Sequence, residues 1–149
     1  MGAVAQGYVE ITSSGIRLVG NLILAGAAQD DIAALPLAST LQESVLFPHL
    51  VSDQAYFTSI TILNPNVTDA IATIEIYTAD GRLDSSISEI IPARQRKSRL
   101  LTEYFPHLVG KNRTSGHIRL SVDRGVASFA LFGSHDSSIL AAIPPQTIP

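Results

Sequence analysis

The two ends of this chain carry two versions of one sequence, and this internal repeat constrains the fold more than any other feature. The version near the carboxyl end reads GHIRLSVDRGVASFALFGSHDSSILAAIP, from Gly116 to Pro144. A blurred version near the amino end reads GYVEITSSGIRLVGNLILAGAAQDDIAALP, from Gly7 to Pro36. The two first glycines lie 109 positions apart and the two last prolines lie 108 apart, so the register is kept with small insertions. Self-similarity of this kind is typical of proteins built from repeated structural units.

The length of the period predicts the domain organisation. In a chain of 149 residues, residues 40–149 make one complete repeat, and residues 1–38 resemble the carboxy-terminal part of a preceding repeat. We therefore interpret the chain as a fragment of a longer tandem protein. One structural unit over residues 1–149 is the expectation for this length, which is sufficient to bury a hydrophobic core.

The composition excludes several classes of function. Hydrophobic residues make up 46% of the chain and charged residues only 15%, whereas soluble domains average about 25% charged residues. The net charge of −3 provides no long-range field to attract nucleic acid. Arg17 and Asn21 interrupt the most apolar stretch, so no run approaches the roughly 18 residues of a membrane helix, and we expect no membrane insertion. The absence of cysteine excludes disulfides and thiolate metal sites.

Alternating apolar and polar residues predict three strands in the middle of the chain, over Tyr56–Asn64, Ala70–Tyr77 and Leu83–Ile91. Asp80 and Gly81 lie between the last two of these strands. An Asp-Gly pair in this position is typical of a two-residue hairpin turn with positive φ at both residues.

The repeated ends predict further strands. In the first copy we expect a hairpin made of strands 8–12 and 16–24 around Gly15, followed by a short edge strand that ends at Pro36. In the second copy we expect the corresponding strands over 117–122, 126–132 and 139–143. One compact sandwich would then contain both copies of the hairpin, with residues 56–91 between them.

A short phrase also occurs twice, as LFPHLV at 46–51 and YFPHLV at 104–109. His49 and His107 could act as metal ligands or bases, but neither has a second histidine or a carboxylate at the spacing of a metal site. We favour the interpretation that each phrase is an apolar plug with its histidine as a polar tip. The residues that would enter the core are Phe47 and Leu50 in the first phrase, and Phe105 and Leu108 in the second.

The segment Arg94–Arg99 holds four of the ten basic residues. A site for nucleic acid or anionic lipid is one interpretation, although no aromatic residues are interleaved with the charges. The interpretation that we favour is protection of an exposed strand edge against aggregation. The following residues, Leu100–Phe105, predict one short helical turn that Pro106 ends.

The loop GSHDSS contains serine, histidine and aspartate together, which raises the hypothesis of a hydrolase that uses Ser134, His135, Asp136 or Ser137. Catalytic triads normally bring these residues from separate loops, and the equivalent loop of the first copy lacks both the serine and the histidine. We therefore favour a polar turn. The chain also has no EF-hand loop, HExxH helix or glycine-rich phosphate loop, so we expect no catalytic residue, metal or cofactor.

A different hypothesis is a sandwich that binds a small ligand or a carbohydrate. Sugar sites generally need exposed aromatic platforms, and this chain has no tryptophan. The candidates for such a platform are Tyr8, Tyr56, Tyr77 and Tyr104.

Short strands separated by glycine, proline and Asp-Gly, with almost no helix, predict an all-β fold, an antiparallel β-sandwich that is immunoglobulin-like in a broad sense. The phrases GHIRLSVD at 116–123, VASFALFG at 126–133 and LAAIP at 140–144 carry a resemblance as well. With FPHLV, LNP and the Asp-Gly turn, they resemble the tandem β-sandwich repeats of large exported or cell-surface bacterial proteins. This resemblance implies an extracytoplasmic, non-catalytic module and carries over no catalytic residue.

These observations together favour a structural or interaction module, such as a spacer, an adhesion segment or an assembly domain. The expected partners are other protein modules, or a second copy that meets this chain through exposed strands. A small-ligand or carbohydrate-binding sandwich is the alternative.

Overall fold

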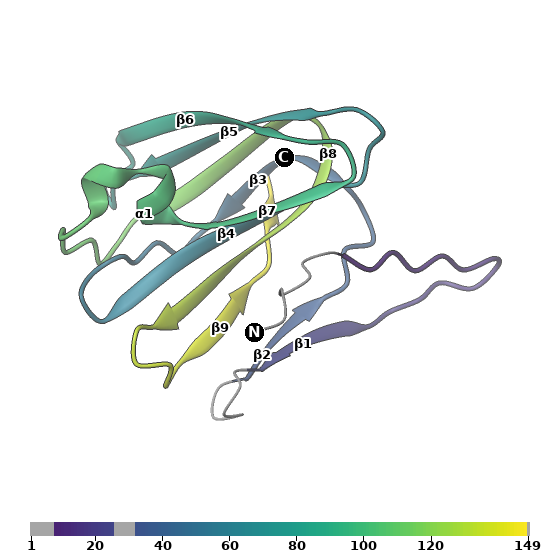
Figure 1. Ribbon diagram of the computed structural model, residues 1–149, viewed down its shortest axis with the longest axis horizontal. Coiled ribbons are helices and arrows are strands. Elements are labelled where there is room, and N and C mark those ends of the chain that lie inside the picture. Colours follow the sequence, from purple (N-terminus) through teal and green to yellow (C-terminus); the bar gives the residue numbers. More distant parts are fainter. Residues whose placement is uncertain (1–7, 26–31, 149) are drawn as a thin grey trace, which may run out of the picture.

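The computed structural model describes residues 8–25 and 32–148, and the fold is all-β, as predicted (Figure 1). The strands are β1 (Asn21–Ala25), β2 (Ile32–Pro36), β3 (Gln42–Phe47), β4 (Tyr56–Asn64), β5 (Ala70–Tyr77), β6 (Leu83–Ile91), β7 (Gln95–Leu100), β8 (His117–Ser134), β9 (Leu140–Ile143) and β10 (Gln146–Thr147). The helical turn expected before Pro106 is present as α1 (Leu101–Tyr104), and a 3₁₀ turn, η1 (Pro106–Leu108), follows it.

The long strand β8 belongs to both layers of the sandwich. Its first half pairs with β5 and β3, which gives one layer in the order β6-β5-β8-β3-β10. Its second half pairs with β4 and β9, which gives the other layer in the order β7-β4-β8-β9. All of these pairs are antiparallel. A strand that bends from one sheet into the other forms a corner that joins the layers covalently.

The bend in β8 corrects one prediction. Residues 117–122 and 126–132 form one continuous bent strand, not a hairpin. Gly125 lies at the bend without a positive φ, so it makes no tight reversal. A Cβ atom at this position would come within 2.9 Å of the Leu41 side chain, so the glycine permits a close contact. Asp123 supports the corner by accepting a hydrogen bond of 2.8 Å from the backbone N–H of Ile71.

The hydrophobic core fills the space between the two layers. Alternate residues of β5 and of the first half of β8 are buried there, and β4 is buried at five consecutive residues; Ile60, Ile74 and Leu120 are among the core residues. The two plug phrases behave as predicted, because each contributes a phenylalanine and a leucine to this core. The four plug residues are Phe47, Leu50, Phe105 and Leu108.

The central hairpin β5–β6 is confirmed, but its turn is one residue longer than expected. Of the two residues Asp80 and Gly81, only Gly81 has a positive φ, at 81°. The backbone N–H of Thr78 donates to the carbonyl of Arg82 at 2.9 Å, which leaves a three-residue loop between them. A type I turn followed by a left-handed glycine produces this geometry.

The amino-terminal residues depart most from expectation. Residues 8–12 form no strand, and β1 pairs with β2 instead of with them. Among the described residues, β1 and β2 form a separate two-stranded sheet, so the prediction of one sandwich that incorporates both hairpins is wrong. The small sheet lies beside the sandwich, where β2 contacts β9 (Figure 1).

Two short strands were not predicted. The segment 37–55 contains one of them, β3, and the other, β10, follows Pro145. The polar start of β3 hides its strand character in the sequence. Its position between β8 and β10 explains why it is extended.

Candidate functional site

The internal repeat is present in the strand register. Leu22 of β1 pairs with Leu35 of β2, and 108 positions later Ala130 of β8 pairs with Ile143 of β9. The same offset relates four consecutive residue pairs of the two ladders. The sheet β1–β2 is therefore the structural counterpart of the hairpin that closes the sandwich.

The two copies of this hairpin differ at the outer edge of their first strand, the edge of β8 that faces away from β9 and the edge of β1 that faces away from β2. In the second copy, the edge of β8 opposite β9 is covered by the antiparallel strand β4. Among the described residues, β1 pairs only with β2, so the equivalent edge is free. The sequence of β1, NLILA, holds no charge and no proline. A free strand edge of this kind offers its backbone N–H and carbonyl groups for pairing with another strand.

We call residues 8–25 and 32–36 the amino-terminal arm. Several of its apolar residues are exposed although their counterparts in the complete repeat lie in the core. Val9 is 85% exposed, whereas its counterpart Ile118 is fully buried. On the outer face of the small sheet, Ile23 is 67% exposed and Ile32 is 63% exposed. Contiguous exposed apolar surface on a soluble protein generally marks a contact site.

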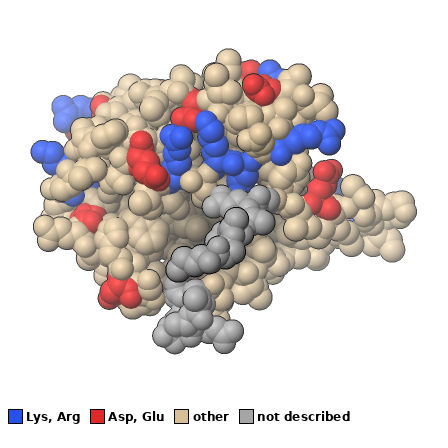
Figure 2. All heavy atoms as spheres, in the orientation of Figure 1, with Lys and Arg blue, Asp and Glu red and all other residues tan. Residues whose placement is uncertain are grey.

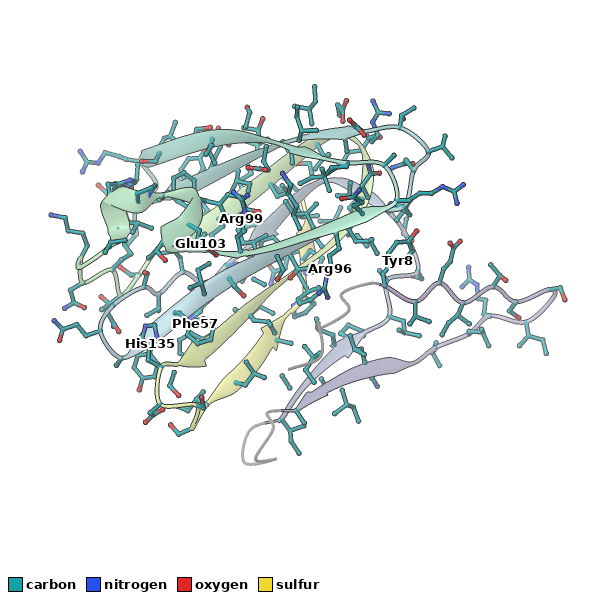
Figure 3. The ribbon with its side chains drawn as sticks, viewed as in Figure 1. Tyr8, Phe57, Arg96, Arg99, Glu103 and His135 are labelled. Atoms are coloured by element: carbon teal, nitrogen blue, oxygen red, sulfur yellow. The ribbon has the colours of Figure 1, made fainter. Side chains whose placement is uncertain are left out.

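One face of the arm is anchored to the sandwich. Ala33 and Leu35 of β2 are buried, and β2 contacts β9. The N–H of Leu37 donates to the carbonyl of Gly20 at 2.9 Å, which extends the pairing of β1 with β2 by one step. Figure 3 shows the rest of the arm as an extended chain that reaches away from the sandwich and carries side chains on both sides. The arm is thus held in place while its outer face stays open.

The four candidate tyrosines do not form one platform. The Tyr56 ring stacks on Phe132 at 5.3 Å, and the Tyr77 ring stacks on His117 at 4.8 Å. Tyr8 is half-buried and lies on the arm (Figure 3). Within the described part of the chain, no ring contact joins any two of the four tyrosines.

Tyr104 requires a correction, because it is only 2% exposed and presents no ring face to a ligand. Burial, with a smaller contribution from Glu89, raises the pKa of its hydroxyl to about 12. The Arg99 guanidinium lies over its ring, 5.7 Å from the centroid.

The GSHDSS loop uses its polar side chains to hold its own backbone. The Ser134 hydroxyl accepts hydrogen bonds from the N–H groups of Ser138 and Ile139, at 3.0 and 2.9 Å. Hydrogen bonds from the Ser134 and Ser138 side chains lower the pKa of Asp136 to about 2. The His135 ring packs against Phe57 instead, with centroids 5.5 Å apart (Figure 3). Among the described residues no hydrogen bond joins that ring to Ser134 or Asp136, so the three side chains form no catalytic relay.

A hollow of about 260 Å³ lies next to this loop, at the end of the sandwich that carries α1. Phe57, Leu100 and Leu108 contribute apolar surface, and Lys111 and His135 also line it. Ser52 and Asp53 belong to the lining as well, but Asp53 accepts its hydrogen bonds from the backbone N–H groups of Ala55 and Tyr56. None of the four candidate tyrosines is among the lining residues.

The basic segment forms the edge strand β7, next to the edge strand β6 of the other layer. Lys97 forms an ion pair with Glu89 of β6, and the Arg99 guanidinium lies 3.7 Å from the same carboxylate. Figure 2 shows basic and acidic atoms side by side over this part of the surface. Charged side chains that close the gap between two edge strands protect those edges, so this arrangement agrees with the hypothesis of edge protection.

One polar cluster had no sequence signal, because its members are 23 and 29 positions apart. Asp84 of β6 contacts the His107 ring at 3.2 Å and the Arg113 guanidinium at 2.8 Å. Partial burial opposes ionisation of Asp84, but the hydrogen bonds from His107 and Arg113 outweigh it and lower its pKa. The cluster fastens η1 and the following loop to β6. Within the described residues, no group of three or more potential metal ligands is present.

His49, in the other plug phrase, has a different environment. Its ring meets Phe132 edge-on, with centroids 4.8 Å apart. The Nε2 atom is buried without a hydrogen-bond partner among the described residues. The prediction of a polar tip is therefore wrong for His49, whose ring packs as part of the aromatic group at this end of the sandwich.

Comparisons with known proteins inform the fold. No protein-family model and no curated protein sequence matches the chain. The structure is similar to that of the Anabaena sensory rhodopsin transducer, with a TM-score of 0.51 and 16% sequence identity, over 62% of this chain and 97% of the other. A likeness at this identity shows the fold alone. In the described part of the chain, no helix has the length and apolar character needed to cross a membrane.

Proposed function

We propose that this protein is a non-enzymatic assembly module that makes its contacts through the amino-terminal arm. The observation that carries the proposal is the contrast between the two copies of the repeat. Val9 and Ile11 are exposed in the first copy, and their counterparts Ile118 and Leu120 are core residues in the second. The arm therefore presents to solvent a surface whose pattern is suited to burial.

Further features support an assembly role. The free edge of β1 is uncharged, in contrast to β7, where charged side chains protect the edge. Addition of a strand to a free edge is a common mode of protein recognition. The resemblance to tandem repeats of exported bacterial proteins agrees with this role, and we propose an extracytoplasmic location on the same basis.

The test is the molar mass of the full chain over a wide range of protein concentrations, measured by sedimentation equilibrium. We expect the mass of the wild type to rise above that of the monomer as concentration increases. Ile23→Lys places a charge on the outer face of the arm and should keep the protein monomeric. Ile71→Lys is the matched control, because Ile71 is 54% exposed and belongs to β5, which is not part of the arm.

A wild-type protein that stays monomeric at every concentration would overturn the proposal. Equal loss of assembly in Ile23→Lys and Ile71→Lys would show that the arm is not the contact surface. Far-ultraviolet circular dichroism of both variants establishes that each retains the β fold.

A further inference from the structure

The partner of the arm can be specified from the geometry of its free edge. This step rests on the proposed function and names the strand that the arm meets. We propose that β1 pairs antiparallel with β1 of a second copy, so that two small sheets join into one four-stranded sheet in the order β2-β1-β1′-β2′.

The complete repeat establishes the polarity of this edge. The counterpart of the free edge of β1 is the edge of β8 that pairs antiparallel with β4. In a second copy, β4 is not available, because it is already paired on both sides, with β7 and β8. The occupant must therefore be an edge strand that can approach antiparallel.

The other described edge strands fit less well than β1. Strands β6 and β7 carry charged residues, and Glu89 of β6 pairs with Lys97 and Arg99 of β7. Strand β10 has only two residues, and the edge strands β2 and β9 already pack against each other. Strand β1 has five residues and no charge, so two copies meet with neither electrostatic repulsion nor a buried unpaired charge. A two-fold contact also satisfies both free edges at once, because the same surface serves both partners.

Pairing of all five residues fixes the register. The sequence NLILA has Ile23 at its centre, so complete antiparallel overlap places Ile23 opposite Ile23 of the partner copy. Leu22 then lies opposite Leu24 of the other copy. The two Ile23 side chains share the exposed outer face, where directly opposed Cβ atoms lie about 4.5–5.5 Å apart and apolar pairs stabilise a sheet.

Cysteine substitution tests this register cleanly, because the natural chain has no cysteine. Ile23→Cys, Leu22→Cys, Leu24→Cys and the control Ile71→Cys are each made in the full chain and incubated in a glutathione redox buffer. Disulfide-linked dimer is quantified over time on non-reducing gels. We expect Ile23→Cys to form dimer roughly tenfold faster than Ile71→Cys, because pairing raises the effective concentration of the two thiols. A mixture of Leu22→Cys and Leu24→Cys should form the mixed dimer in preference to either homodimer.

The outcomes separate this inference from the proposed function. If sedimentation shows arm-dependent assembly but Ile23→Cys links no faster than Ile71→Cys, the assembly role stands and the β1–β1′ contact is refuted. Preferred self-linking of Leu22→Cys or Leu24→Cys would likewise refute the register centred on Ile23. Absence of both assembly and linking would overturn the proposed function together with the inference. Fast linking at position 23, with the mixed dimer, supports both.

Discussion

Replacement of the buried Asn64 tests how the end of β4 is fastened to the following turn and to the end of β6. Asn64 ends β4 and is fully buried. Its amide nitrogen donates to the carbonyls of Thr68 and Ile91, at 2.9 and 3.0 Å. Its amide oxygen accepts from the backbone N–H and the side-chain amide of Asn66, at 3.0 and 2.8 Å. One side chain therefore connects the end of β4, the following turn and the end of β6.

The magnitude of the effect of Asn64→Ala follows from the burial of these partners. The hydrogen bond to the Ile91 carbonyl is buried, and an unsatisfied buried acceptor costs about 1–3 kcal/mol. The other three bonds are partly buried, so water replaces them in part, at a net loss of about 0.5–1.5 kcal/mol each. The expected decrease in the free energy of unfolding is about 2.5–7.5 kcal/mol, a large share of the roughly 5–15 kcal/mol of a typical domain.

Urea denaturation, followed by circular dichroism, measures this decrease at constant m-value. The melting temperature should fall by about 5–30 °C for a chain of this size. Asn66→Ala should cost less, because Asn66 lies at the surface of the network, and Asn112→Ala in an exposed loop should be near neutral. A decrease below about 1 kcal/mol for Asn64→Ala would refute the argument, since it would mean that the network contributes little.

Two further predictions concern a glycine and a turn. Gly116→Ala should destabilise the fold strongly, because Gly116 has a φ of 133° and a Cβ atom there would meet the Tyr77 carbonyl oxygen at 2.2 Å. Gly110→Ala is the control: Gly110 has a φ of 72° and no atom within 4 Å of the added Cβ, so its loss of stability in urea denaturation should be only about 1–2 kcal/mol. Equal losses in the two variants would contradict the steric argument. The pKa of Asp136 is lowered to about 2 in the folded state, so its contribution to stability is present at neutral pH and is lost as the pH falls from about 4 to about 2. The melting temperatures of the wild type and Asp136→Asn should therefore converge across that range, and a constant difference would show that the turn does not depend on the charge.

Local sequence patterns predicted the strands whose partners are close in the chain. Alternation and the Asp-Gly pair were sufficient for β5 and β6, because a hairpin brings its own partner strand. The burial of the plug phrases could also be predicted, since Phe47 and Phe105 each precede a proline that fixes the backbone. These features depend on residues within a few positions of one another.

The features that sequence did not predict depend on distant neighbours. Residues 117–122 and 126–132 looked like a hairpin because Gly125 separates them, but two different layers hold the two halves in one bent strand. The contact of Asp84 with His107 joins residues 23 positions apart, and no local pattern marks it. The candidate tyrosine platform fails at Tyr104 because that residue is buried and the Arg99 guanidinium lies over its ring.

The repeat shows most directly that neighbours decide whether a strand forms. Residues 8–12 alternate apolar and polar residues as 117–122 do, yet only the second segment is a strand, because only it lies between β5 and β3. The hairpin β1–β2 forms in both copies, since its partner is the next strand in the chain. The arm thus retains the hairpin β1–β2, but among the described residues it lacks the neighbouring strands that would bury its outer face. This difference connects the fold with the proposed function, because a strand edge without a neighbour is available for pairing with another chain.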